Sequence, residues 1–162
     1  MSRNNGSPTS QFQAVEELLT RWLKERRALL ARFTEIAVAL DSNADDHALR
    51  QRQDSLCELL VDYVSAGHFE VFHELINEAE AFADGSDDLA RKIIPSIGDT
   101  TEVVLAYEEK YSGEDNHKDT LKRDLSALGE VLESRFVMED RLIAGLHGRH
   151  RRLVGEQASP QA

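Results

Sequence analysis

The sequence predicts an all-α fold, an antiparallel up-and-down helix bundle of four long helical segments. Apolar residues recur at helical spacing over most of the 162 residues. Strand signals are absent, because no run of alternating β-branched residues stands between turn dipeptides. Two of the three prolines lie close to the ends of the chain. Short polar turns separate the segments, and short connections make neighbouring helices antiparallel.

The first helix is expected from about Ser10 to Leu40. Apolar residues alternate there at spacings of four and three, which is typical of bundled helices. Arg26 stands where this seam calls for an apolar residue. The seam consists of Val15, Leu19, Trp22, Leu29, Phe33, Ile36 and Leu40. A polar turn with helix-capping residues follows at positions 41–46.

The second helical segment is expected from about Asp46 to Ala83, with a kink near Ser65–Gly67. Its two halves carry apolar faces that differ by about 100°, roughly one residue of phase in an α-helix. The first face holds Leu56, Leu59, Leu60, Tyr63 and Val64, and the second holds Val71, Phe72, Leu75, Ala79 and Phe82. The slip falls at a glycine, a residue that is unfavourable inside helices and common where they bend.

The third helix is expected from about Asp87 to Tyr111, with Pro95 either kinking its first turns or opening the main helix. The fourth is expected from about Asp115 to His147, on a seam that keeps its spacing over eight positions. The length predicts one domain. The predicted bundle occupies residues 11–148, with a disordered N-terminus at 1–10 and a disordered basic tail at 149–162.

Charged residues interrupt the apolar seams. Arg26, Arg135 and Glu139 are expected to meet inside the bundle together with His68. A buried charge must be paired and hydrogen-bonded, because an isolated one is very costly. Such a cluster is either a structural ion network that fixes packing, or a polar pocket that reads a ligand or transmits a signal.

Composition excludes several classes of function. The net charge of −11 argues against general DNA binding, which depends on Lys and Arg that neutralise phosphates. The longest purely apolar stretch, Ile36–Leu40, is far too short to span a membrane. The N-terminus has no apolar signal-peptide core. Cys57 is the only cysteine, so neither an internal disulfide nor a cysteine zinc site is expected. These features predict an acidic cytoplasmic protein.

No motif requires catalysis or a cofactor. Four-helix bundles often hold di-iron sites built from Glu-x-x-His pairs, and such pairs occur at Glu70–His73 and Glu114–His117. The second pair falls at a loop, so a metalloprotein is kept only as an alternative, and no cofactor or metal is expected. Cys57 lies on an apolar helix face and is expected to be inert. His147-x-x-His150 is interpreted as a surface pair at a fraying helix end. Phosphate-binding, dinucleotide-binding and nucleophile-elbow motifs are absent, so the protein is not expected to be an enzyme.

Acidic residues are concentrated in the middle of the chain. The stretch between Arg52 and Arg91 contains ten Asp and Glu and neither Lys nor Arg. This face either keeps the protein soluble or attracts a basic partner. Asp62, Ser65 and Phe69 lie at i, i+3 and i+7, on one side of a continuous helix. Phe69 is then either an exposed binding anchor or, if the kink turns it inward, a core residue.

Three stretches resemble the Rsd/AlgQ family of anti-sigma factors. Two are continuous, LVDYVSAGHF at 60–69 and LESRFVMEDRLI at 132–143. The third consists of Arg21, Trp22, Leu23, Arg26, Leu29 and Leu30. The resemblance covers about residues 12–147, and the stretch at 70–82 is closest to the AlgQ-like branch.

The resemblance implies a helical protein that binds region 4 of the primary sigma factor of RNA polymerase. Region 4 is a basic helix-turn-helix module that reads the −35 promoter element and docks on core enzyme. The family's sigma-contacting residues match Asp62, Ser65 and Phe69 here. Other matching positions are assigned to a structural polar network of Arg21, Trp22, Arg26, His68, Arg135 and Glu139.

The implied protein contacts neither nucleic acid nor membrane directly, and a monomer is favoured. By masking region 4 it would shift transcription toward alternative sigma factors. An acidic helical adaptor for some other regulatory protein is the alternative that uses the same face.

Overall fold

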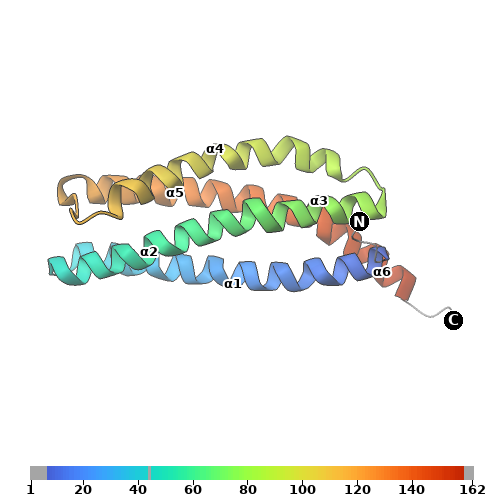
Figure 1. Ribbon diagram of the computed structural model, residues 1–162, viewed down its shortest axis with the longest axis horizontal. Coiled ribbons are helices and arrows are strands. Elements are labelled where there is room, and N and C mark those ends of the chain that lie inside the picture. Colours follow the sequence, from blue (N-terminus) through green and yellow to red (C-terminus); the bar gives the residue numbers. More distant parts are fainter. Residues whose placement is uncertain (1–6, 44, 159–162) are drawn as a thin grey trace.

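The computed structural model describes residues 7–43 and 45–158, with the backbone alone for 156–158. These residues form an all-helical bundle of long, roughly antiparallel rods, as the sequence predicts (Figure 1). The elements are α1 (Pro8–Asp41), α2 (Asp46–Ala66), the π-helical turn η1 (Gly67–Val71), α3 (Phe72–Phe82), α4 (Asp87–Tyr111), α5 (Lys118–Ile143), the π-helical turn η2 (Ala144–Gly148) and α6 (Arg149–Ala158). Within the described residues there is no strand.

Helix α1 begins at Pro8, so the expectation of disorder up to residue 10 is wrong for its last three positions. The Ser7 side chain caps the helix by accepting a hydrogen bond of 3.1 Å from the backbone N–H of Ser10. Proline suits the first helical turn, because the N–H it lacks would have no partner there. Residues 1–6, the rest of the expected disordered N-terminus, lie outside the described part of the chain.

The predicted kink in the second segment is confirmed as the π turn η1. The backbone N–H of Phe72 donates to the carbonyl of Gly67, five residues back. A π turn takes up one residue more than an α turn, which is the phase slip seen in the sequence. Gly67 is required by close packing, because a Cβ there would lie 2.9 Å from the Trp22 ring. The apolar faces of α2 and α3 therefore both reach the core.

Helix α4 has the bounds that the sequence predicts, whereas the start of α5 differs. Helix α4 starts at Asp87, so Pro95 lies inside it, exposed, and does not open it. Helix α5 starts at Lys118, three residues later than expected, after a turn in which His117 has a positive φ of 47°. Short side-chain bonds hold this turn, including one of 2.8 Å from the His117 backbone N–H to Asp115.

The expected disordered tail is wrong for residues 149–158, which form α6. After Ile143 the chain makes the second π turn and continues as helix at the end of the bundle where α1 begins and α3 ends (Figure 1). His147 and His150 are buried, so their interpretation as a surface pair is also wrong. They point inward because carboxylates on α1, α3 and the α3–α4 loop meet them there.

The core runs along the axis of the bundle and is built from the predicted seams. Its largest fully buried side chains include Trp22, Tyr63 and Tyr111. Trp22 and Tyr63 stack with ring centroids 4.6 Å apart, and Phe72 meets Trp22 edge-on. Cys57 is buried as expected, and burial raises the pKa of its thiol to about 12, so the thiol is unreactive at neutral pH.

Candidate protein-binding site

The three residues predicted to contact a partner lie together on the outer side of α2 and η1. Asp62, Ser65 and Phe69 line a shallow hollow of about 460 Å³, with Glu25 of α1 and Glu70 beside them. Phe69 is 73% exposed, and its only ring neighbour among the described residues is the exposed His68. The alternative that the kink turns Phe69 into the core is therefore wrong.

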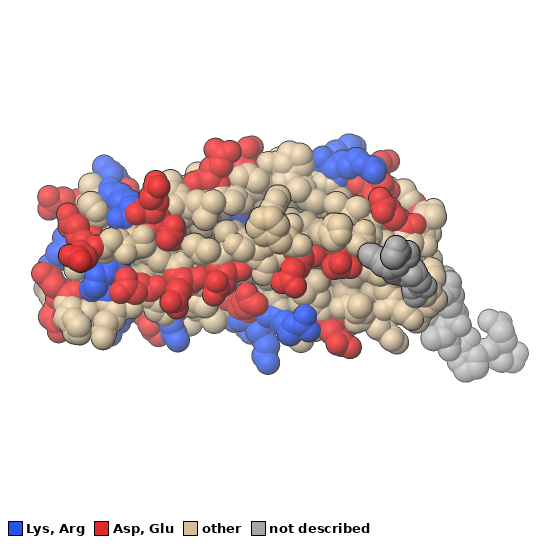
Figure 2. Space-filling view, in the orientation of Figure 1, with Lys and Arg blue, Asp and Glu red and all other residues tan. Residues whose placement is uncertain are grey.

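Carboxylates surround this hollow. Glu25 is half-buried, and its pKa is raised by burial and then by the negative charges of Asp62 and Glu70. Figure 2 shows Asp and Glu side chains in a row along the α1–α2 side of the visible face, with Lys and Arg at its α1 margin. Asp54 and Glu58 extend the acidic surface along α2. An exposed aromatic ring within an acidic field favours a basic, partly apolar partner.

The shape of the hollow depends on the π turn beneath it. The carbonyl of Tyr63 accepts the backbone N–H of Gly67 and also the indole N–H of Trp22, the latter over 3.1 Å. Because Trp22 is buried on α1, this bond ties α2 to α1 in the core just before the π turn. Phe69 keeps the register of α2, on the same side as Asp62 and Ser65, and the π turn then brings the apolar face of α3 toward the core.

A buried ion network lies in the middle of the bundle, behind α2. Glu139 accepts hydrogen bonds from Arg26 at 2.9 Å, from Arg135 at 2.7 Å and from the hydroxyl of Tyr63. Arg26 also pairs with Asp140 at 2.8 Å. Burial raises the pKa of Glu139, while the two guanidinium groups oppose that shift. We name these residues the central network: Arg26, Tyr63, Arg135, Glu139, Asp140 and the two threonines described next.

The central network is closed on its far side by α4. Arg135 is fully buried and donates to the hydroxyls of Thr100 at 3.2 Å and Thr101 at 2.7 Å. The prediction that Arg26, Arg135 and Glu139 meet inside the bundle is correct. The prediction that two further charged or titratable residues belong to this network is wrong. Arg21 and His68 both lie exposed on the surface. Tyr63, Thr100 and Thr101 were missed, because a hydroxyl on an apolar face gives no separate signal in the sequence.

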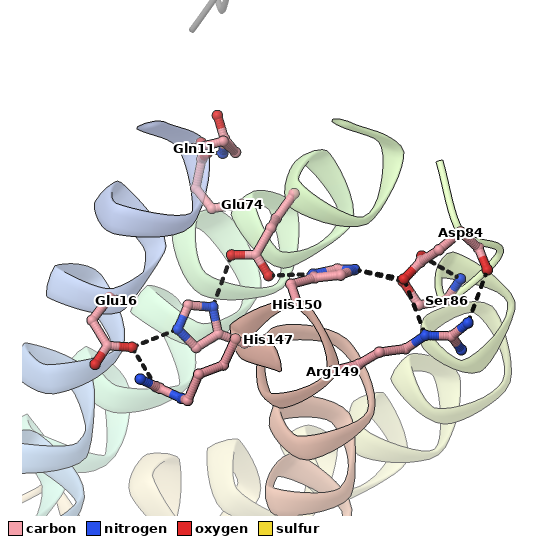
Figure 3. Close-up of polar contacts among 10 residues, drawn as sticks. Gln11, Glu16, Glu74, Asp84, Ser86, His147, Arg149 and His150 are labelled. Carbon is pink, nitrogen blue, oxygen red and sulfur yellow. Dashed lines mark hydrogen bonds and ion pairs between the residues drawn. The ribbon is translucent and has the colours of Figure 1, made fainter. Parts of the chain in front are cut away.

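A second buried polar cluster joins α6 to the bundle. The two carboxylate oxygens of Glu78 contact His147 Nδ1 at 2.8 Å and His150 Nδ1 at 2.6 Å. The other ring nitrogens face outward, His147 toward Glu16 at 2.6 Å and His150 toward Asp84 at 3.1 Å. Figure 3 shows this chain of contacts from Glu16 on α1 to Asp84 and Ser86 in the α3–α4 loop. We name it the end cluster.

Two arginines complete the end cluster. Arg151 pairs with Glu16 at 2.6 Å, and Arg149 pairs with Asp84 at 3.1 Å. The sequence contains one sign of this arrangement, because Glu78 falls on the apolar face of α3 between Leu75 and Ala79. A carboxylate in that position needs a buried partner.

The described residues hold no group of three or more His, Cys, Asp or Glu arranged to bind a metal ion. Of the two Glu-x-x-His pairs, the first has both members exposed, and the second lies in the turn before α5. None of the helices searched is both long and apolar enough to cross a membrane.

Comparison with known proteins gives a family for the chain. Residues 1–147 match the family described as "Regulator of RNA polymerase sigma(70) subunit, Rsd/AlgQ". The chain is 29% identical to the "Regulator of sigma D" of Yersinia pseudotuberculosis serotype O:1b (strain IP 31758) over 142 residues, covering 85% of this chain and 83% of the relative.

The protein of the same name from Shigella boydii serotype 4 (strain Sb227) is 32% identical over 142 residues, covering 83% of this chain and 87% of the relative. No solved structure matches the chain. The family match spans all three stretches in which the sequence resembles these proteins and every residue of the central network, so the chain belongs to the Rsd/AlgQ family of regulators of the RNA polymerase sigma(70) subunit.

Proposed function

We propose that this protein is an anti-sigma factor that binds region 4 of the primary sigma factor through the surface of Asp62, Ser65 and Phe69. The observation that carries the proposal is an aromatic ring 73% exposed beside a hollow lined by carboxylates. Membership of a family of sigma(70) regulators supplies the class of partner. The expected partner surface is basic, because it reads DNA by neutralising phosphates.

Each residue of the surface has a distinct task in this proposal. Asp62 pairs with an Arg or Lys of region 4, and the surrounding carboxylates speed the encounter. Phe69 is buried near the centre of the interface, where aromatic anchors contribute most of the binding energy. Ser65, which is half-buried, allows close approach and offers a hydroxyl.

The mechanism is competitive masking and needs no covalent chemistry. Sigma factor whose region 4 is covered docks neither on core enzyme nor on the −35 element. Transcription from housekeeping promoters then falls, and alternative sigma factors gain core enzyme by mass action. The protein acts as a monomer in the cytoplasm, where RNA polymerase works.

A titration of the full chain against a purified region 4 fragment tests the charge in this surface. Asp62→Arg is expected to weaken binding about tenfold or more while leaving the helical circular dichroism unchanged, because it places like charges across the interface. Asp99→Arg is the matched control, since Asp99 is exposed on α4 and the change in net charge is the same. Equal losses in the two variants would mean that net charge, and not this surface, governs binding.

The same titration at low and high salt separates charge from apolar burial. Phe69→Ala is expected to weaken binding about tenfold or more at both salt concentrations, because loss of a central aromatic costs on the order of 2 kcal/mol. Leu105→Ala, on the exposed side of α4, is the control. Salt should weaken the wild-type complex through its ion pairs. Binding that is unaffected by either Asp62→Arg or Phe69→Ala would refute the proposed surface.

A further inference from the structure

A second surface, which the proposed function does not use, lies between α1 and α5. It is a groove of about 740 Å³ with a largely apolar floor. The floor is formed by Leu30, Phe33, Ala37 and Leu40 of α1, and by Leu125, Gly129, Leu132, Phe136 and Val137 of α5. It shares no residue with the hollow of Asp62, Ser65 and Phe69.

Small side chains open this groove. Ala37, Ser126 and Gly129 line it where the two helices face each other. The ring of Phe33 lies directly against Gly129, since a Cβ at that glycine would come within 2.8 Å of it. The Phe33 ring therefore occupies the space that a side chain at position 129 would fill, and forms the floor of the groove there.

Ion pairs close the groove at both ends. Lys122 and Asp41 lie 3.9 Å apart at one end, and Arg26 pairs with Asp140 at 2.8 Å at the other. The lining between Lys122 and Asp140 covers about five turns of α5, or roughly 27 Å at ~1.5 Å per residue. This length corresponds to an α-helix of about 18 residues.

The rim of the groove combines apolar and acidic side chains. Leu30 is 40% exposed and Val137 is 56% exposed, so apolar surface stays uncovered along it. Glu130 and Glu133 line the α5 side, and neither has an ion-pair partner among the described residues. The lining as a whole holds four acidic residues and one lysine.

From these features we propose that the groove binds an amphipathic α-helix of a protein partner, with an apolar stripe on the floor and Lys or Arg along one edge. An elongated, open, apolar channel suits a helix, which is read through side chains at i, i+3, i+4 and i+7. Glu130 and Glu133, which have no ion-pair partner among the described residues, favour Lys or Arg along one edge of the bound helix. The surface goes beyond the proposed function, because it lies on a different face from Asp62 and leaves that face free.

The test uses the full-length protein and two designed 18-residue peptides. Both carry leucines on one helical stripe, and they carry lysines or glutamates on its flanks. We expect the lysine peptide to bind at least tenfold more tightly than the glutamate peptide by fluorescence anisotropy. Equal affinities would overturn the charge-selective part of the proposal.

Point variants locate the binding. Val137→Arg fills the groove from an exposed position and is expected to weaken binding of the lysine peptide at least tenfold. Leu105→Arg, at an exposed position on α4, is expected to leave the affinity for this peptide unchanged. Replacing both Glu130 and Glu133 by Lys should remove the preference for the lysine peptide. The control replaces the exposed Asp99 and Glu102 of α4 by Lys. Equal effects of groove and control variants would mean that the peptide binds elsewhere.

Measurements of region 4 binding distinguish a failure of the groove proposal from a failure of the proposed function. Val137→Arg is expected to leave the affinity for region 4 unchanged, and Asp62→Arg is expected to leave the affinity for the lysine peptide within about twofold. Loss of region 4 binding in Val137→Arg would overturn the groove as a separate site. Loss of peptide binding alone, with region 4 binding intact, supports it.

Discussion

The central network and the end cluster each compensate a buried carboxylate, but they do so with different side chains. In the central network, arginines compensate buried Glu139, and a guanidinium keeps its charge at every physiological pH. In the end cluster, histidines compensate buried Glu78. Both ring nitrogens of His147 face carboxylate oxygens, and an imidazole can donate to both only when both nitrogens carry protons.

The difference follows the position of each cluster in the fold. The central network lies behind the candidate binding surface, where Tyr63 and Trp22 hold α2 against α1. The end cluster holds α6 against α1, α3 and the loop before α4. The middle of the bundle is therefore held by guanidinium–carboxylate pairs, while the attachment of α6 depends on imidazole–carboxylate contacts.

The largest expected effect is in the central network. Glu139→Ala leaves buried Arg135 without its carboxylate, and breaking a buried pair in this way costs about 3–5 kcal/mol of unfolding free energy. Urea denaturation measures it. Asp140→Ala removes an exposed partner of Arg26 and should cost no more than about 1 kcal/mol. Similar losses in the two variants would show that burial does not set the strength of this network.

A smaller effect is expected at the end cluster. Glu78→Gln removes the charge shared by His147 and His150 but keeps one acceptor, so the loss should be about 2–3 kcal/mol. Hydrogen exchange should show that the amides of α6 lose protection before those of α5. Glu74→Gln, whose side chain bonds only Gln11 among the described residues, is the control. Uniform loss of protection along the chain would contradict the assignment of this cluster to α6.

The smallest effect depends on pH. Hydrogen bonds from His147 and Arg151 hold the pKa of Glu16 below its usual value of 4.5. A carboxyl with a lowered folded pKa stabilises the fold above its unfolded pKa, and that contribution disappears as the pH falls through the folded pKa. Glu16→Gln should therefore cost up to about 1 kcal/mol near pH 7, since Glu16 is partly exposed, and progressively less below pH 4.5.

Thermal unfolding of the wild type and of Glu16→Gln at several pH values measures the difference in stability. Glu17→Gln, at an exposed position on the same helix, should change stability by no more than about 0.5 kcal/mol throughout. A cost of Glu16→Gln that stays constant down to pH 3 would show that its bonds to α6 do not depend on its charge.

The sequence was sufficient where a pattern repeats. The seams of α1 and α5 predict both helices and the meeting of Arg26 with Arg135 and Glu139, because each charge occupies a core position. The one-residue phase slip predicts the bend at Gly67, because the apolar faces before and after it both have to reach the core. The hollow around Phe69 needed the structure, since periodicity alone left that ring either inside or outside.

The errors fall where position in a helix does not decide burial. Residues 149–152 are mostly basic, which predicts a solvent-exposed segment. His150 is nevertheless fully buried, because its carboxylate partners come from residues about 70 positions earlier in the chain. His68 lies within the π turn, whose extra residue rotates it outward. Arg21 is next to buried Trp22, and a helix turns adjacent residues about 100° apart.

The π turn also governs how the length of this segment can change. An inserted residue in α3 would rotate everything after it by about 100° and carry Glu78 away from its two histidines. A deletion within 67–71 has the opposite result, since an ordinary α turn would keep both apolar faces inward. The fold would survive that deletion. Phe69 would stay on the side of Asp62 and Ser65 if the lost residue follows it in the chain, and would turn toward the core if the lost residue precedes it. The position of a single lost residue therefore decides whether the shortened bundle still presents its exposed aromatic ring.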